Sequence, residues 1–154
     1  DIKNNDKAVE AVLNKKIDGL DNLKYRYKAV LEIPSIKLKR GILDIDNKYN
    51  KAKYNIELIK EKDDIIVLAS HNGNNYNSYF GNLKNISLGD TINYYYDGKI
   101  YKYIYTDSYD IKKDGYADIY RKKGNKCIVL VTCKDGRNDG QTVFIGYLDE
   151  ILEY

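Results

Sequence analysis

The chain has 154 residues, 26 of them Lys or Arg and 23 Asp or Glu, which gives a formal net charge of +3. This length favours one domain that buries about two thirds of the surface exposed by its unfolded chain. Charges of both signs are mixed along the sequence, which argues against a dedicated nucleic-acid surface. No stretch comes near the length of an apolar membrane span, about 18 residues, and no signal-peptide core is present.

The first part of the chain predicts a helix. Across residues 5–22, apolar side chains recur at three- and four-residue steps, with lysines and aspartates between them. This periodicity is typical of an amphipathic helix. We therefore expect residues 1–24 to form a helical appendage on the outside of the domain formed by residues 25–154.

Short extended segments then replace the helical pattern. They cover residues 28–33 and 36–45, and the lone proline, Pro34, lies between them. Residues 48–54 predict a weak turn or short helix, and residues 79–86 predict a short helical turn.

The clearest local structure is a β-hairpin over residues 91–105. An Asp-Gly pair at its centre suits the positive φ angles of a two-residue turn, and alternation resumes on either side. Tyr101, Tyr103 and Tyr105 share one face. With lysines between them, such tyrosines could stack on single-stranded nucleic acid, but half-buried packing against the sheet is the favoured interpretation.

Two apolar runs each lead to a residue that can do covalent chemistry. Residues 65–70 run into His71, the only histidine, and residues 127–132 run into Cys133. β-branched runs bounded by Gly, Asn and Asp are typical of strands buried on both faces inside a sheet. If the two strands are parallel neighbours, imidazole and thiol emerge at the same edge, which suits a thiol nucleophile with a histidine partner.

A last strand is expected over residues 142–148, after a polar loop. Seven or more short strands with little helix indicate a closed or nearly closed β-barrel. The predicted fold class is mostly β, with the N-terminal amphipathic helix and one or two short helices.

The two cysteines lie at opposite ends of one predicted strand. Cys127 and Cys133 would have Cα atoms about 20 Å apart, whereas a disulfide needs less than about 7 Å. Cys133, where the strand ends, is the stronger candidate nucleophile. The alternatives are that it is a small buried hydrophobe and that His71 is an ordinary polar residue at a strand end.

Arg137 follows Cys133 in the loop, where its guanidinium could stabilise an oxyanion; the alternative is an exposed loop charge. Metal binding is a weaker prediction. One histidine and two cysteines at opposite ends of a strand supply no four-ligand zinc set. Asp135 and Asp139 could hold a calcium ion, but the spacing of a twelve-residue calcium loop is absent.

Several of these features occur together in one known family. The chain resembles the sortases over residues 28–148, and this resemblance implies an eight-stranded barrel. The resemblance rests on His71 at a strand end, Phe80-Gly81-Asn82-Leu83 after it, Gly89-Asp90 opening the next strand, and Val129-Leu130-Val131-Thr132-Cys133 before a loop and a final strand.

Sortases are cysteine transpeptidases on the outer face of Gram-positive membranes. The resemblance implies cleavage of a sorting signal, within a motif such as Leu-Pro-x-Thr-Gly, and transfer to an amine of a peptidoglycan precursor or a pilin. Cys133 would form the thioester, and His71 would protonate the leaving amine and deprotonate the incoming one. Thr132 and Asn72 would contact the substrate. No cofactor and no nucleic-acid partner are implied, and the membrane anchor would lie outside this chain.

The chain departs from the family at one important position. The family's arginine usually begins the last strand, where this sequence has Gln141. We expect Arg137 to substitute for it as a third catalytic residue. The alternatives are that Gln141 donates a neutral hydrogen bond, which stabilises an oxyanion less than a charged donor does, or that the alignment of the loop is shifted.

Some features of the sequence bear on the sortase subclass. Residues 106–126 are too few for the long helix of class B sortases, which favours a compact barrel of class A, D or E. His71-Asn72 and Phe80-Gly81-Asn82-Leu83 nevertheless resemble class B. The N-terminal segment has no lid motif of the kind found in pilus-building sortases.

Two other interpretations stay open. A non-catalytic β-barrel could bind peptide or oligonucleotide along its tyrosine-rich strands, with Cys133 inert. A papain-like protease is the weaker alternative, because that family places its cysteine on a helix and before its histidine, whereas here His71 comes first and both residues follow strands.

Overall fold

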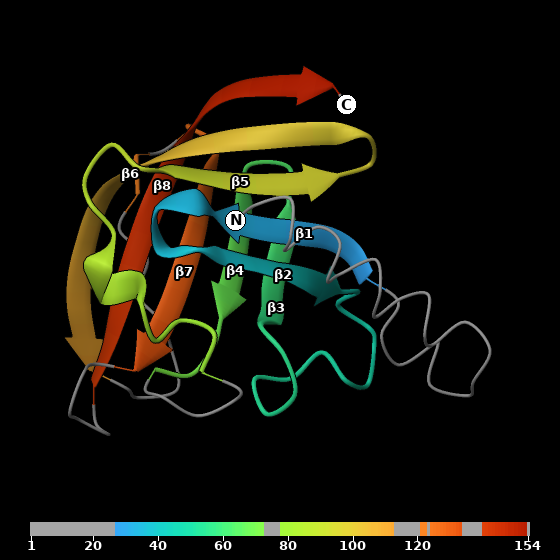
Figure 1. Ribbon diagram of the computed structural model, residues 1–154, viewed down its shortest axis with the longest axis vertical. Helices are drawn as coiled ribbons and strands as arrows, with labels where there is room; N and C mark the ends of the chain where they lie inside the picture. The colour runs from blue at the N-terminus through green and yellow to red at the C-terminus, as the bar shows by residue number, and fades with distance from the viewer. Residues whose placement is uncertain (1–26, 73–77, 113–120, 123, 134–139, 154) are drawn as a thin grey trace.

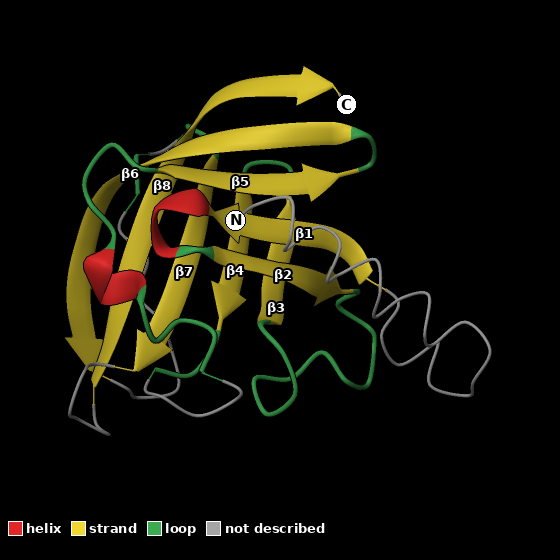
Figure 2. Cartoon of the chain, in the orientation of Figure 1, coloured by secondary structure: helices red, strands yellow, loops and turns green. Residues whose placement is uncertain are grey.

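The computed structural model describes residues 27–72, 78–112, 121–122, 124–133 and 140–153. The predicted helix over residues 5–22, and with it the boundary of the appendage, lies outside the described residues. The described residues lie mostly in strands (Figure 2). In chain order the elements are β1 (Tyr27–Ile33), the 3-10 turn η2 (Pro34–Ile36), β2 (Leu38–Leu43), β3 (Glu57–Lys62), β4 (Ile65–Ala69), the 3-10 turn η3 (Leu83–Asn85), β5 (Thr91–Tyr96), β6 (Lys99–Lys112), β7 (Cys127–Cys133) and β8 (Gly140–Glu153).

One sheet connects these eight strands in the order β2-β1-β5-β6-β8-β7-β4-β3. The sheet curls, so that β1, β2 and β5 cross β4, β7 and β8 at a steep angle (Figure 1). The edge strands β2 and β3 approach each other, and Asn55 Nδ2, just before β3, donates to the carbonyl oxygen of Gly41 in β2 at 2.9 Å. The described strands therefore form the nearly closed eight-stranded barrel that the sequence predicts.

Side chains that alternate along β4 and β7 pack on opposite sides of the sheet. Leu68 and Leu130 belong to the main core inside the barrel, whereas Val67, Val129 and Val131 belong to a second apolar cluster. All five are at most 4% exposed. Burial on both faces explains why these strands are apolar throughout rather than alternating, and it confirms the prediction for the two runs.

The β5–β6 hairpin is also confirmed. The two strands pair along the whole of β5, and the turn residues Asp97 and Gly98 have φ angles of 51° and 74°. Tyr103 and Tyr105 are only 4% and 6% exposed and lie in the main core. These two side chains are therefore packing residues, and they offer no surface on which bases could stack.

Some strand boundaries differ from the predictions. β3 has no predicted counterpart, because this edge strand buries only Leu58 and so lacks an apolar pattern. β2 begins later than expected, since Lys37 adopts a left-handed φ of 55°. β6 and β8 extend beyond their expected ends because the polar end of each pairs with the other strand. Residues 48–54 form turns, and η3 lies within the predicted helical turn.

The hairpin turn provides a test of backbone conformation alone. A Cβ atom added at Gly98 would meet nothing within 4 Å, and φ there is +74°. Gly98→Ala should therefore lower the free energy of unfolding by about 1–2 kcal/mol, the cost of a left-handed residue. Urea unfolding measures the change, with Lys99→Ala as the exposed control at under about 0.5 kcal/mol. Equal stability of the two variants would contradict the turn geometry.

Candidate active site

The parallel pairing of β4 with β7 brings the ends of both strands to one edge. The register runs from Ile65 opposite Cys127 to Ala69 opposite Val131. Beyond β4 the ladder continues, because the Ser70 N–H donates to the Val131 carbonyl at 3.2 Å. The parallel adjacency predicted from the two apolar runs is thus confirmed.

His71 and Cys133 occupy equivalent places beyond this ladder. His71 follows Ala69 as Cys133 follows Val131, and those two are register partners. Neighbouring strands lie about 4.8 Å apart. The histidine is exposed, and its carbonyl accepts a hydrogen bond of 3.3 Å from the N–H of Phe80. The backbone of His71 is thereby tied to a residue of the main core, while its imidazole faces solvent.

The predicted Phe80–Leu83 motif explains how that tie is held. Phe80 and Leu83 are 1% and 0% exposed, and the Leu83 N–H donates to the Phe80 carbonyl at 3.2 Å. Two buried side chains thus anchor the turn that follows His71. Their burial accounts for the apolar residues at these two positions.

Gln141 lies directly across from Cys133 on the neighbouring strand. The β7–β8 register pairs Cys133 with Gln141 and Thr132 with Thr142. Residues directly opposite in an antiparallel pair have Cβ atoms about 4.5–5.5 Å apart on the same face of the sheet. The half-buried Gln141 is therefore within reach of chemistry at position 133. Arg137 lies outside the described residues, as do Asp135 and Asp139.

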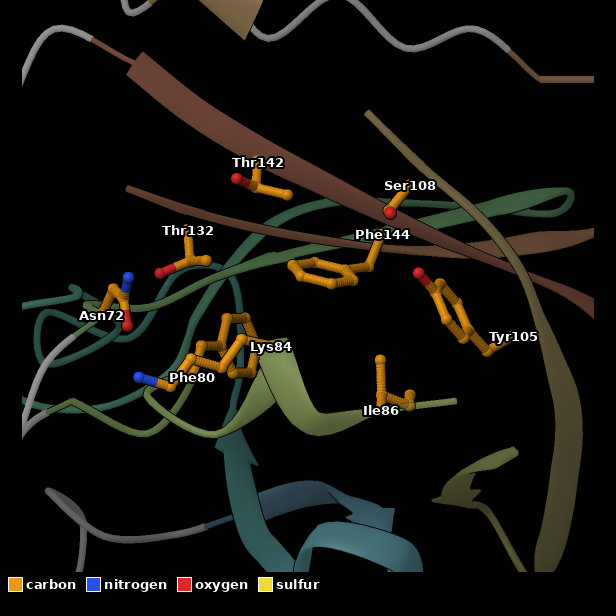
Figure 3. A pocket seen from close by; sticks show the side chains of 9 residues that line it. All are labelled: Asn72, Phe80, Lys84, Ile86, Tyr105, Ser108, Thr132, Thr142 and Phe144. Atoms are coloured by element: carbon orange, nitrogen blue, oxygen red, sulfur yellow. The ribbon is translucent and has the colours of Figure 1, made fainter. Parts of the chain in front are cut away.

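Thr132 and Asn72, the predicted substrate contacts, both line a cavity of about 250 Å³. Because side chains alternate along β7, Thr132 lies on the same face of the strand as Leu130 of the main core. Thr132 is 5% exposed, and its hydroxyl has no hydrogen-bond partner among the described residues. The remaining lining residues are Phe80, Lys84, Ile86, Tyr105, Ser108, Thr142 and Phe144 (Figure 3).

Sequence reasoning missed most of this cavity. Lys84 comes from η3, Ser108 from β6 and Phe144 from β8. No spacing in the sequence relates these residues, since η3 lies against the barrel only in the folded chain. Lysine is also common throughout the sequence, which left Lys84 without a distinguishing signal.

Cys127 lies at the other end of β7 in a different environment. It is 1% exposed, and Arg121 Nη1 lies 4.0 Å from its Sγ. Arg121 also forms an ion pair of 3.0 Å with Asp64. Burial raises the pKa of the Cys127 thiol, although the Arg121 hydrogen bond opposes this effect. A buried thiol with a raised pKa is a structural residue and not a nucleophile.

No group of three or more His, Cys, Asp or Glu side chains that could hold a metal ion occurs in the described ranges. Over the same part of the chain, none of the helices has the length and apolar character needed to cross a membrane.

Comparisons with known proteins agree with this architecture. A model of the sortase domain matches residues 31–148. Sortase A of Listeria monocytogenes superposes with a TM-score of 0.69 at 20% identity, covering 83% of this chain and 90% of that one. Sortase C-3 of Streptococcus pneumoniae gives 0.72 at 13% identity, covering 97% and 84%. A sortase D5 transpeptidase of Clostridium perfringens gives 0.64 at 17%, covering 92% and 89%. A search of curated proteins finds no match.

The buried thiol leads to a labelling prediction. Iodoacetamide near neutral pH should modify the native chain on one cysteine only, because the raised pKa and the burial of Cys127 both slow thiolate formation and access. Peptide mass spectrometry identifies the labelled site. Cys127→Ala should still take up one label and Cys133→Ala almost none. Rapid labelling of Cys127 in the native protein would contradict the described environment.

Proposed function

The chain belongs to the sortase family of cysteine transpeptidases, and we propose that Cys133 is its nucleophile and His71 its general acid and base. The observation that carries this proposal is the parallel β4–β7 register, which leaves both residues at equivalent positions beyond one sheet edge. The exposure of His71 gives it access to a substrate amine.

The proposed reaction has two halves. The Cys133 thiolate attacks the scissile carbonyl carbon, a carbon–sulfur bond forms, and the carbonyl oxygen becomes an oxyanion. Collapse of this intermediate breaks the carbon–nitrogen bond, and His71 gives a proton to the leaving amine. In the second half an incoming amine attacks the thioester, His71 takes its proton, and the carbon–sulfur bond breaks to release the new amide.

Stabilisation of the oxyanion falls to Gln141 in this proposal. Its register position opposite Cys133 supports the assignment, because the amide Nε2 carries two donors that can reach an oxyanion formed at the neighbouring residue. A neutral amide stabilises this charge less than a guanidinium does. The departure from the family's arginine would then change the strength of the donor while keeping its place on β8.

The substrate in this proposal is the sorting-signal peptide of a surface protein. The acceptor is an amine of a peptidoglycan precursor or a pilin, and the reaction takes place at the outer face of a Gram-positive cell membrane. Membership of the sortase family supports these assignments. One of the similar structures, from Streptococcus pneumoniae, is described in terms of pilin substrate specificity, and we extend only the general class of substrate to this chain.

The assignment of nucleophile and base predicts the effect of two substitutions. Cys133→Ala should abolish cleavage of fluorogenic sorting-motif peptides, and His71→Ala should lower the rate by at least about a hundredfold, the usual contribution of a positioned acid–base group. Cys127→Ala is the matched control and should keep cleavage near the wild-type rate. If either Cys133→Ala or His71→Ala still cleaved the sorting-motif peptides at the wild-type rate, the proposal would be contradicted.

A second prediction concerns the oxyanion donor. Gln141→Ala should lower kcat by about a hundredfold or more, as loss of an oxyanion donor does in other acyl-transfer enzymes. Arg137→Ala should have a much smaller effect on kcat. Steady-state kinetics of peptide cleavage compare the two variants. If Arg137→Ala is the damaging change and Gln141→Ala is not, the donor comes from the loop and the assignment to Gln141 is wrong.

A further inference from the structure

The cavity beside Thr132 lies next to the proposed reacting residues in the chain. Thr132 directly precedes Cys133 in the chain, and Asn72 directly follows His71. One end of the cavity therefore adjoins both proposed reacting residues. The cavity is therefore positioned for a molecule that reacts with an acyl group on Cys133.

The buried hydroxyl of Thr132 marks this cavity as a binding site for a polar group. Thr132 is 5% exposed, and its Oγ1 has no partner within the described structure. Buried polar groups are nearly always hydrogen-bonded, and an exception calls for an explanation. Thr142, its register partner, is different, because its hydroxyl donates to Asp110 Oδ1 at 2.8 Å. A ligand that accepts a hydrogen bond from Thr132 would supply the partner.

The lining of the cavity identifies the chemistry of that ligand. Lys84 is the only charged residue among the described residues that line it. Figure 3 shows the Lys84 amine, the Asn72 amide and the Thr132 hydroxyl toward the same end, with the Phe144 ring farther along. An ammonium, an amide and a hydroxyl together suit a carboxylate. The aromatic part suits a short apolar segment.

The size of the cavity limits the ligand to a small one. Its volume of about 250 Å³ falls below the range of about 300–1,000 Å³ that is usual for drug-sized ligands. One or two small amino acid residues fit this space, whereas a long peptide would have to extend out of it.

We propose that this cavity binds the acyl acceptor, and that the acceptor is a primary amine that also carries a free carboxylate. This inference rests on the proposed transpeptidase function. The carboxylate binds Lys84 and Thr132, and the amine reaches the thioester carbon from the end of the cavity that Thr132 and Asn72 line. The amine nitrogen forms a bond to that carbon, the carbon–sulfur bond breaks, and His71 accepts the proton that the nitrogen loses.

The test compares two acceptors that differ only in charge. Diglycine, with a free carboxylate, and diglycine amide are each supplied with a sorting peptide, and transfer and hydrolysis products are separated by mass spectrometry. In the wild type, kcat/KM for diglycine should exceed that for the amide by about tenfold, as expected for one hydrogen bond to a charged group. Lys84→Gln should bring the two acceptors within about twofold of each other and leave donor hydrolysis unchanged.

Three further arms sharpen this test. Lys84→Glu should reverse the preference, because it places a negative charge beside the carboxylate. Thr132→Val removes the hydroxyl at nearly constant shape and should also weaken the preference for diglycine. Lys126→Gln changes an exposed lysine at the opposite end of β7 and is the matched control, with the wild-type preference retained.

The outcomes separate the two proposals. If the wild type hydrolyses no sorting peptide, the proposed function fails. If hydrolysis is normal but the wild type prefers neither acceptor, or the Lys84→Gln variant keeps the full preference for diglycine, the acceptor assignment is overturned while the transpeptidase function stands.

Discussion

The parallel hydrogen bonding between β4 and β7 is the constraint on which the rest of the structure depends. Parallel neighbours cannot be joined by a short turn, so the chain between them forms β5 and β6, which complete the barrel wall before β7 is added. As a result of this long connection, the ends of β4 and β7 meet at one edge of the sheet. His71 and Cys133 lie there because of the register from Ile65 opposite Cys127 to Ala69 opposite Val131.

Because side chains alternate along β7, the two sides of this strand lie in different surroundings. Val129 and Val131 pack in an apolar cluster on one side, while Leu130 lies in the main core and Thr132 lines the cavity on the other side. In the proposed reaction, the acceptor carboxylate binds in this cavity beside Thr132.

The barrel and the adjacency of the strands that lead to His71 and Cys133 could be predicted from the sequence because both depend on local patterns. Burial on two faces makes β4 and β7 apolar throughout, and the Asp97-Gly98 turn needs positive φ angles that few residues adopt. β3 escaped prediction because an edge strand buries little. The cavity escaped because Lys84 and Thr132 line it together only through the packing of η3 on the barrel, and no periodicity encodes that arrangement.

The most direct test of the central claim is to look for the covalent intermediate itself. The chain is incubated with a panel of sorting-motif peptides without added amine, quenched in acid, digested and analysed by mass spectrometry. The account predicts an acyl adduct on Cys133 that hydroxylamine removes. An adduct confined to Cys127, or cleavage of a peptide by Cys133→Ala, would contradict a mechanism built on the β4–β7 edge.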